Sequence, residues 1–182
     1  MKSSNWSESV AAIDFITALG RVLHDGALRD AFTADAGTFV REIELRENDQ
    51  PAFLRLAPAD LEIQARVLLR KRFDLVRSHL PMTCREMGKG AWDAFANYGR
   101  ACVPKTKDSI AEDALYFSQY VGKTQPEFLC AVELNRCRFA CEQRRLSIHV
   151  VSGIRKKWLP SLQVLIRRDT TRWMEWRVFL GA

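Results

Sequence analysis

Apolar residues recur at helical spacing through the first two thirds of the chain. Residues 10–23 carry apolar side chains three or four positions apart, and a shorter pattern of the same kind covers residues 28–40. Gly26 lies between these two patterns and is expected to end the first helix. Residues 61–76 predict a longer helix, which starts at Pro58 because proline suits the first helical turn, and which ends before Pro81.

Further helices are expected between Pro81 and Arg145. Thr83 followed by Glu86 has the spacing of a capping box, so we expect Thr83 to cap a helix that continues through residues 92–98. Residues 114–120 predict the next helix, with a second capping box at residues 109–112 and a stop at Gly122. A strongly patterned helix is expected over residues 126–144, and residues 42–57 are expected to form a connecting segment.

The character of the chain changes after Arg145. Residues 146–151 are rich in β-branched side chains, residues 162–166 form a second apolar run, and residues 172–180 alternate in part, with a turn expected at residues 169–171. The sequence therefore predicts an α+β fold, with a mostly α-helical N-terminal domain and a small C-terminal antiparallel β-sheet of about three strands. We place the helical domain at residues 1–125, and a helix with the β-sheet module at residues 126–182.

Charge and composition restrict the cellular compartment and the classes of partner that we expect for this protein. The net charge is +6, and residues 128–182 hold 11 Lys and Arg against 4 Asp and Glu, so this third favours an acidic partner. No apolar run approaches the ~20 residues that a membrane-spanning helix needs, and the polar start lacks a secretory pattern. Five cysteines are an odd number for a disulfide framework, which agrees with a compartment where thiols stay reduced. We therefore expect a cytoplasmic protein, and no membrane partner.

The sequence contains no motif that predicts catalysis or a metal. Cys130, Cys137 and Cys141 share one helical face, but no CxxC pair is present, so we interpret them as packing residues, and Cys84 and Cys102 likewise. The three histidines are far apart, and no glycine-rich nucleotide loop and no paired carboxylates stand out. We therefore expect no catalytic residue, no metal site and no cofactor on this chain, while a cysteine-based enzyme or metal-binding protein stays open as an alternative.

Two kinds of binding surface are compatible with the C-terminal third. The edge of a small sheet can accept an extended peptide as an added strand, and basic flanks would favour an acidic peptide. Residues 155–158, Arg167 and Arg168 lie among Trp173 and Trp176, and basic residues interleaved with aromatic ones are also found in proteins that bind single-stranded nucleic acid. The number of basic residues is modest, so a nucleic-acid-binding or regulatory protein is the alternative hypothesis.

Residues 69–83 predict a basic helix that ends in Leu-Pro-x-Thr, and Trp92, Tyr98 and Pro104 follow it. This pattern resembles that of a family of helical companion proteins encoded beside barrel-type iron enzymes. Residues 128–134 are similar to the next helix of the pattern, and the tail at residues 173–176 also fits. The resemblance covers roughly residues 60–182 and is greatest to the MbnC family of methanobactin biosynthesis.

This resemblance implies a non-catalytic subunit. MbnC-like proteins pair with MbnB, a barrel enzyme that holds the iron, and together they use dioxygen to convert cysteines of the MbnA precursor peptide to oxazolone and thioamide groups. Iron is then expected on the partner subunit. On this chain we predict a peptide-binding set and a partner interface. The peptide-binding set is Leu162, Val164, Ile166, Arg167, Arg168, Trp173 and Trp176. The interface is Arg70, Arg72, Arg77 and His79.

Overall fold

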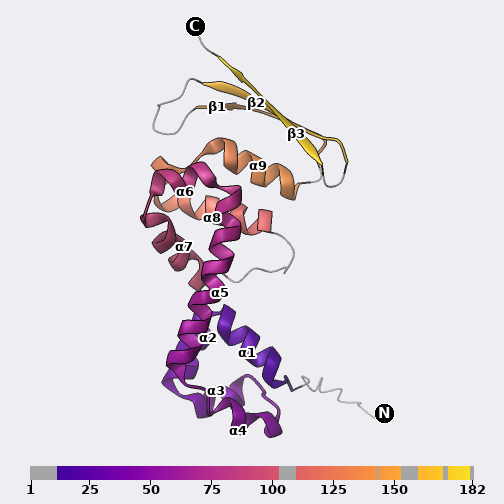
Figure 1. The fold of residues 1–182 in the computed structure, drawn as a ribbon. Coiled ribbons are helices and arrows are strands. Elements are labelled where there is room, and N and C mark those ends of the chain that lie inside the picture. Colours follow the sequence, from indigo (N-terminus) through magenta and orange to yellow (C-terminus); the bar gives the residue numbers. More distant parts are fainter. Residues whose placement is uncertain (1–11, 103–109, 143, 153–159, 170–171, 181–182) are drawn as a thin grey trace, which may run out of the picture. The chain divides into compact units, whose positions relative to one another are not determined.

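The computed structural model describes residues 12–102, 110–142, 144–152, 160–169 and 172–180. These residues are mostly helical and end in a three-stranded antiparallel sheet, which confirms the α+β fold class (Figure 1). Contacts divide the chain into two compact units, Met1–Leu68 and Leu69–Ala182. The boundary expected near residue 125 falls inside the second of these units.

The first unit is built from short helices that aspartates cap. Asp14, Asp25 and Asp35 each accept a hydrogen bond from a backbone N–H in the first turn of the helix that follows, at 2.8–3.0 Å. α1 ends at His24, just before Gly26 as expected, and Asp25 both closes this helix and caps the next. The elements are α1 (Phe15–His24), α2 (Gly26–Ala34), α3 (Ala36–Glu42), η1 (Glu47–Asp49), α4 (Gln50–Phe53) and the start of α5 (Pro58–His79).

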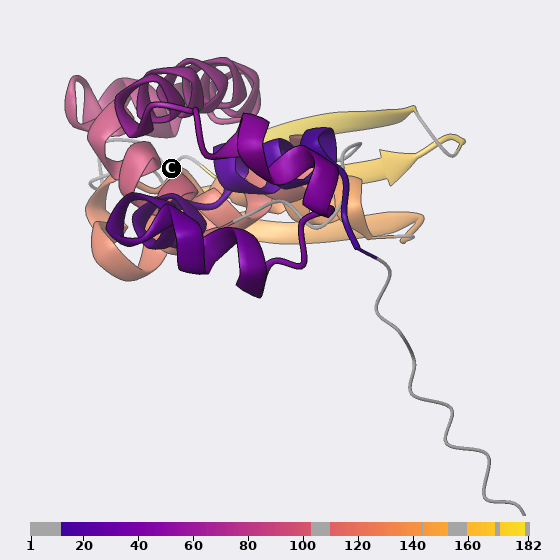
Figure 2. The same cartoon turned by 90° about the horizontal axis from the view of Figure 1, so that it is seen from below.

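Aromatic packing holds the first unit together. Phe53 is fully buried and lies 5.5–6.3 Å, between ring centroids, from Phe15, Phe32 and Phe39. The short helices that supply these rings, and the loops that join them, are indigo and purple in Figure 2. The connecting segment expected over residues 42–57 therefore contains a helical turn, α4, which places Phe53 in this core.

The second unit contains the rest of α5 and the helices that follow it. They are α6 (Pro81–Met87), α7 (Gly90–Ala101), α8 (Ile110–Thr124), η2 (Pro126–Phe128) and α9 (Ala131–Cys141). The prediction of a single helix over residues 126–144 is wrong, because the 3-10 turn η2 and the extended residue Cys130 precede α9. Gly122 does not stop α8, which continues to Thr124.

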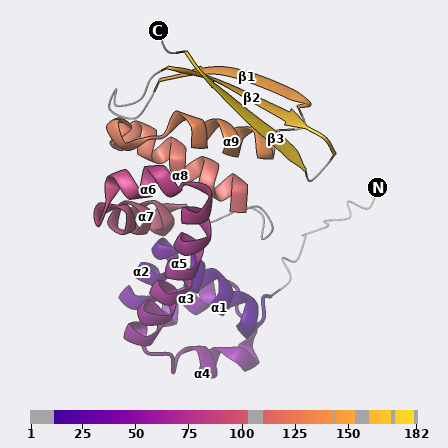
Figure 3. The ribbon, with the colours of Figure 1, turned by 45° about the horizontal axis from the view of Figure 1, so that its top comes forward.

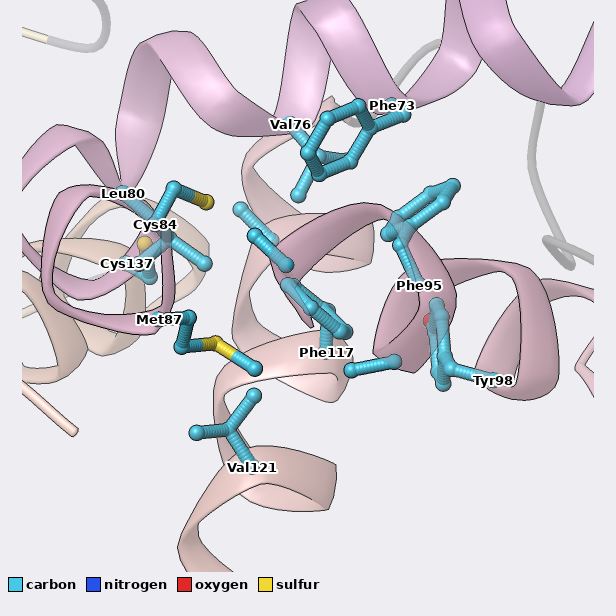
Figure 4. Close-up of a cluster of buried hydrophobic side chains, with 13 residues drawn as sticks. Phe73, Val76, Leu80, Cys84, Met87, Phe95, Tyr98, Phe117, Val121 and Cys137 are labelled. Carbon is cyan, nitrogen blue, oxygen red and sulfur yellow. The ribbon is translucent and has the colours of Figure 1, made fainter. Parts of the chain in front are cut away.

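The core of the second unit lies between α5, α6, α7 and α8. Figure 4 shows Phe73, Phe95 and Phe117 converging, with Met87 and Cys84 at one side. The rings of Phe95 and Phe117 meet edge to face at 5.0 Å between centroids. This core also receives Cys137 from α9, which ties the last helix to the bundle.

A buried carboxylate of α9 caps the N-terminus of α6. Thr83, expected to be an N-cap, lies inside α6, and the cap position is Leu80, whose side chain makes no capping bond. Glu133 instead accepts hydrogen bonds from the N–H groups of Met82 and Thr83, at 2.6 and 2.9 Å, and from the Thr83 hydroxyl at 2.8 Å. The free N–H groups of the first turn are thus satisfied by a residue about fifty positions later in the chain.

The sheet has the order β1-β2-β3, with β1 (Leu146–Val151), β2 (Ser161–Arg167) and β3 (Trp173–Phe179). Both neighbouring pairs are antiparallel, and Val164 of the central strand pairs with Ile148 on one side and with Trp176 on the other. Figures 1 and 3 show α9 lying along one face of this sheet, and no described element of the second unit covers the opposite face. We call these the inner and outer faces.

Candidate functional site

The outer face of the sheet is entirely apolar. Successive side chains along a strand point to opposite faces, so the register assigns one row of three residues from each strand to this side. The nine residues are Leu146, Ile148 and Val150 from β1, Leu162, Val164 and Ile166 from β2, and Met174, Trp176 and Val178 from β3. No charged or polar side chain interrupts the three rows.

Much of this apolar surface is open to solvent. Val150 is 73% exposed, Ile148 56%, Val178 55% and Trp176 46%, while the central row is partly buried between its neighbours. Five of the nine residues are 46–73% exposed, so the apolar patch amounts to several hundred Å². A patch of that size on a monomer often marks a binding site, and one partner in a standard interface contributes about 800 Å². The outer face therefore has the composition of an interface.

The inner face carries the polar residues of the same strands. Gln163 is fully buried and accepts a hydrogen bond from the Asn135 amide of α9 at 3.1 Å, while its own amide donates to the Val132 carbonyl and to Glu175. Arg136 also donates to Glu175. These bonds fix which face of the sheet meets α9, because turning the sheet over would leave buried amides and a carboxylate without partners.

Glu175 is ionised within this network. Burial alone would raise the pKa of its carboxyl, but the hydrogen bonds and positive charges of Arg136 and Arg177 outweigh that effect and hold the pKa below its ordinary value of 4.5. The Arg177 guanidinium lies 2.8 Å from one carboxylate oxygen of Glu175. Glu175 therefore joins α9 to β3 as a charged group at neutral pH.

Arginines gather at one end of the sheet. The start of β1, the end of β2 and the start of β3 meet there, since Leu146 pairs with Ile166 and Ile166 pairs with Met174. The described residues just beyond these ends include four arginines and two acidic residues. They are Arg144, which pairs with Glu142 at 2.8 Å, and Arg145, Arg168 and Arg172, with Asp169. This end of the outer face is therefore positively charged.

The structure divides the predicted peptide-binding residues between the two faces. Leu162, Val164, Ile166 and Trp176 come together on the outer face, and Arg168 is exposed at its basic end. Trp173 lies on the inner face, where its ring packs edge to face on Phe139 of α9.

Arg167 also belongs to the inner face, where its side chain forms hydrogen bonds with backbone carbonyl groups. Its guanidinium donates to the carbonyl oxygens of Phe139, Glu142 and Arg144, beyond and at the end of α9, and lies 5.0 Å from the Phe139 ring centroid. These contacts satisfy carbonyls that the helix leaves without partners. Arg167 and Trp173 therefore fasten the sheet to α9 and are not part of the outer surface.

The predicted partner interface at the end of α5 is divided in the same way. Arg77 and His79 are exposed, and Arg70 is half exposed, beside Asp74 and over the Trp92 ring. Arg72 is instead held inside the bundle by Asp113, with two hydrogen bonds of 2.6 Å.

Asp113 makes this site a buried cluster. The hydroxyl of Tyr98 donates to the same carboxylate at 2.7 Å, so three helices meet at Asp113. Burial would lower the pKa of Arg72, but the bonds and charge of Asp113 outweigh it and raise the pKa. Arg72 therefore stabilises the helical bundle, and only Arg70, Arg77 and His79 of the predicted interface reach the surface.

The cysteines form no cluster in the structure. Cys84, Cys130 and Cys137 are buried, as expected for packing residues, whereas Cys102 and Cys141 are exposed, so the packing interpretation is wrong for these two. Burial raises the pKa of Cys84 to about 11 and that of Cys137 to about 12, which keeps both as thiols. Within the described residues, no three His, Cys, Asp or Glu side chains lie close enough to hold a metal ion.

Sequence reasoning missed five of the nine outer-face residues. They are Leu146, Ile148, Val150, Met174 and Val178. The signal that identifies them is present in the chain, because every second residue of all three strands is apolar on the same side of the register.

Comparisons with known proteins give one match. A family described as "SCO6045-like, C-terminal domain" matches residues 49–123, which run from η1 to the last turn of α8 and precede the sheet. No curated protein and no solved structure matches this chain. Among the described residues, no helix combines the length and the apolar character needed to cross a membrane.

Proposed function

We propose that this chain is a non-catalytic partner subunit of an iron-dependent, dioxygen-using oxidase that modifies a peptide. The oxidase would be MbnB-like, with the iron on that subunit, and this chain would help to recruit an MbnA-like precursor whose cysteines become oxazolone and thioamide groups. The proposal places the complex in the cytoplasm. Its direct basis is the resemblance of residues 69–83 and of the tail to the MbnC family.

One structural observation supports a role in binding another polypeptide. The outer face presents nine apolar side chains with an arginine-rich end, on a sheet whose two edge strands, β1 and β3, have no further strand beside them in the described residues. An open edge can pair with an extended peptide, and an apolar face can dock a partner. Both features serve recognition, and the buried clusters around Asp113 and Glu133 serve stability.

Nucleic acid is a less suitable ligand for this surface. Trp173 and Trp176 lie on opposite faces of the sheet, so the two rings cannot form one stacking platform. Residues 155–158, the other part of that hypothesis, lie outside the described residues. An apolar face flanked by arginines fits an acidic protein better than it fits a continuous phosphate backbone.

The experiment co-expresses this chain with a barrel-type iron enzyme encoded beside it and measures the mass and iron content of the purified complex. We expect a 1:1 complex that contains iron, while this chain purified alone contains none. Adding a cysteine-containing precursor peptide should give a ternary complex and, with dioxygen, a change in peptide mass. A chain that fails to associate with the enzyme and instead binds DNA in a salt-sensitive manner would refute the proposal.

A further inference from the structure

The width of the apolar surface restricts what can cover it. Strands lie about 4.8 Å apart, so the three rows of outer-face side chains span about 10 Å from β1 to β3. An extended peptide added at either edge would contact the nearest row and leave the other two exposed to water. Exposure of 73% at Val150 in β1 and 55% at Val178 in β3 shows that both outer rows need a cover.

A helix has the dimensions of this surface. Its diameter with side chains is about 10–12 Å, which matches the three rows, and helices pack on sheets as a separate layer. The inner face already has such a layer in α9. Along the strands, three outer-face side chains in each row extend about 14 Å, which corresponds to about nine or ten helical residues at 1.5 Å each.

The charges of the sheet indicate an acidic occupant. Arg168 is exposed beyond the end of β2 and Arg172 before the start of β3, whereas Arg144, before the start of β1, already pairs with Glu142 at 2.8 Å. A helix that lies on the outer face with carboxylates in its last turn would place them beside these arginines. The negative C-terminal end of the helix dipole would lie beside the arginines in the same orientation. A second copy of this chain fits poorly, because residues 128–182 of each copy carry 11 basic and 4 acidic residues and would repel each other.

The helix must be formed before it binds. Isolated helices shorter than about 12–15 residues are marginal in water, so a free peptide of the required length would lose much of its affinity to ordering. A helix on the surface of a folded protein has no such cost. Barrel enzymes expose an outer ring of helices, which agrees with the partner expected for this chain.

We propose that the outer face of the sheet docks a surface helix of a folded acidic partner, apolar on the contacting side and carrying carboxylates at one end. This assignment rests on the proposed function, because the partner is then the enzyme subunit. Within the described part of the chain, no further strand lies beside β1 or β3, so their edges remain for the precursor peptide. One small sheet thereby serves two partners, the enzyme through its side chains and the peptide through its backbone.

The test uses the full chain and three synthetic peptides as probes. The first is a side-chain-bridged helix of fourteen residues with leucines at helical spacing and glutamates in its last turn. The second carries lysines in place of those glutamates, and the third is an unbridged scramble of the first. We expect the acidic helix to bind at least about tenfold more tightly than either control, by fluorescence anisotropy, with affinity falling as salt rises.

Substitutions locate the binding. Val150→Asp should weaken binding of the acidic helix about tenfold or more. Ile16→Asp in α1 is the matched control, since both side chains are 73% exposed, and it should leave binding unchanged. Circular dichroism should show that both variants fold. A variant that combines Arg168→Glu and Arg172→Glu should reverse the preference and favour the lysine helix.

The results that would contradict the docking assignment differ from those that would contradict the proposed function. Equal or absent binding of the two bridged helices, or binding that Val150→Asp leaves unchanged, overturns the assignment. A dimer detected by light scattering that Val150→Asp dissociates assigns the face to a second copy instead. An enzyme complex that forms with the wild-type chain and persists with Val150→Asp refutes the docking face but not the proposed function. Failure to form any complex refutes the proposed function and the enzyme as the partner, but not the docking of an acidic helix that the peptides measure.

Discussion

Removing the Glu133 carboxylate should destabilise the second unit more than any surface substitution. Glu133 is fully buried and accepts three hydrogen bonds, two of them from N–H groups in the first turn of α6. In Glu133→Ala these N–H groups and the Thr83 hydroxyl lose their acceptor, and the positive end of the α6 dipole loses its counter-charge. Cys130 donates its N–H to the same hydroxyl at 3.0 Å, so the junction between α6 and α9 loosens as well.

The magnitude follows from the number of bonds. A hydrogen bond to a charged group contributes about 1.5–3 kcal/mol, and a buried donor left without an acceptor costs about 1–3 kcal/mol. These costs overlap, so we expect Glu133→Ala to lower the free energy of unfolding by about 3–5 kcal/mol. Glu133→Gln keeps one oxygen but turns an amide donor toward backbone donors, and should lose about 2 kcal/mol.

Urea unfolding followed by tryptophan fluorescence measures this loss, because Trp92, Trp173 and Trp176 all lie in the second unit. Glu127→Ala is the matched control, since Glu127 is an exposed glutamate shortly before α9 and should change stability by at most about 0.5 kcal/mol. If Glu133→Ala and Glu127→Ala unfold at the same urea concentration with equal slopes, the capping role of Glu133 is refuted.

Three further predictions concern the charged clusters and the thiols. Asp113→Asn should lower stability by about 3 kcal/mol or more, and much less when Arg72 is already replaced by Met; additive losses in a double-mutant cycle would exclude their coupling. Because the pKa of Glu175 is lowered, its stabilisation is full above its ordinary pKa of 4.5 and is lost as pH falls through the lower folded value. Acid should therefore reduce the stability of the wild type more than that of Glu175→Gln in thermal melts, and parallel losses would contradict this. Brief alkylation of the native protein at mildly alkaline pH should modify Cys102 and Cys141 before the buried thiols, as mapped by mass spectrometry; equal modification of all five would show that the core opens readily.

The strands and the fold class could be predicted because they depend on local sequence patterns. Residues 146–151 are rich in β-branched side chains, residues 162–166 form an apolar run and residues 172–180 alternate in part, and each of these segments coincides with a strand of the structure. The start of α5 at Pro58 follows from the same kind of local rule. Periodicity thus determined where most elements lie.

Features that depend on distant partners could not be predicted in this way. Thr83 and Glu86 have the spacing of a capping box, yet a carboxylate about fifty residues away satisfies the helix start instead. Arg72 has the sequence context of a surface arginine, and only the fold brings Asp113 to it across 41 positions. Such pairings are set by tertiary packing, which no local window contains.

The candidate site was predictable in part for a related reason. Leu162, Val164 and Ile166 were found because they form one apolar run, but strand alternation alone does not say which face is covered. That choice depends on Gln163 and Glu175, whose polar groups find partners on α9 and so turn the apolar rows away from the helix. The covered side of this sheet is its polar side, which reverses the usual expectation.

This reversal has a consequence for the life of the protein in the cell. An apolar sheet face with two open edges is what chaperones and quality-control proteases recognise in incompletely assembled chains, and it is also a template for aggregation. The chain is protected from proteases and from aggregation only when this face is covered. If the proposed partner covers this face, the abundance of this protein should follow the supply of that partner, because surplus copies would be degraded.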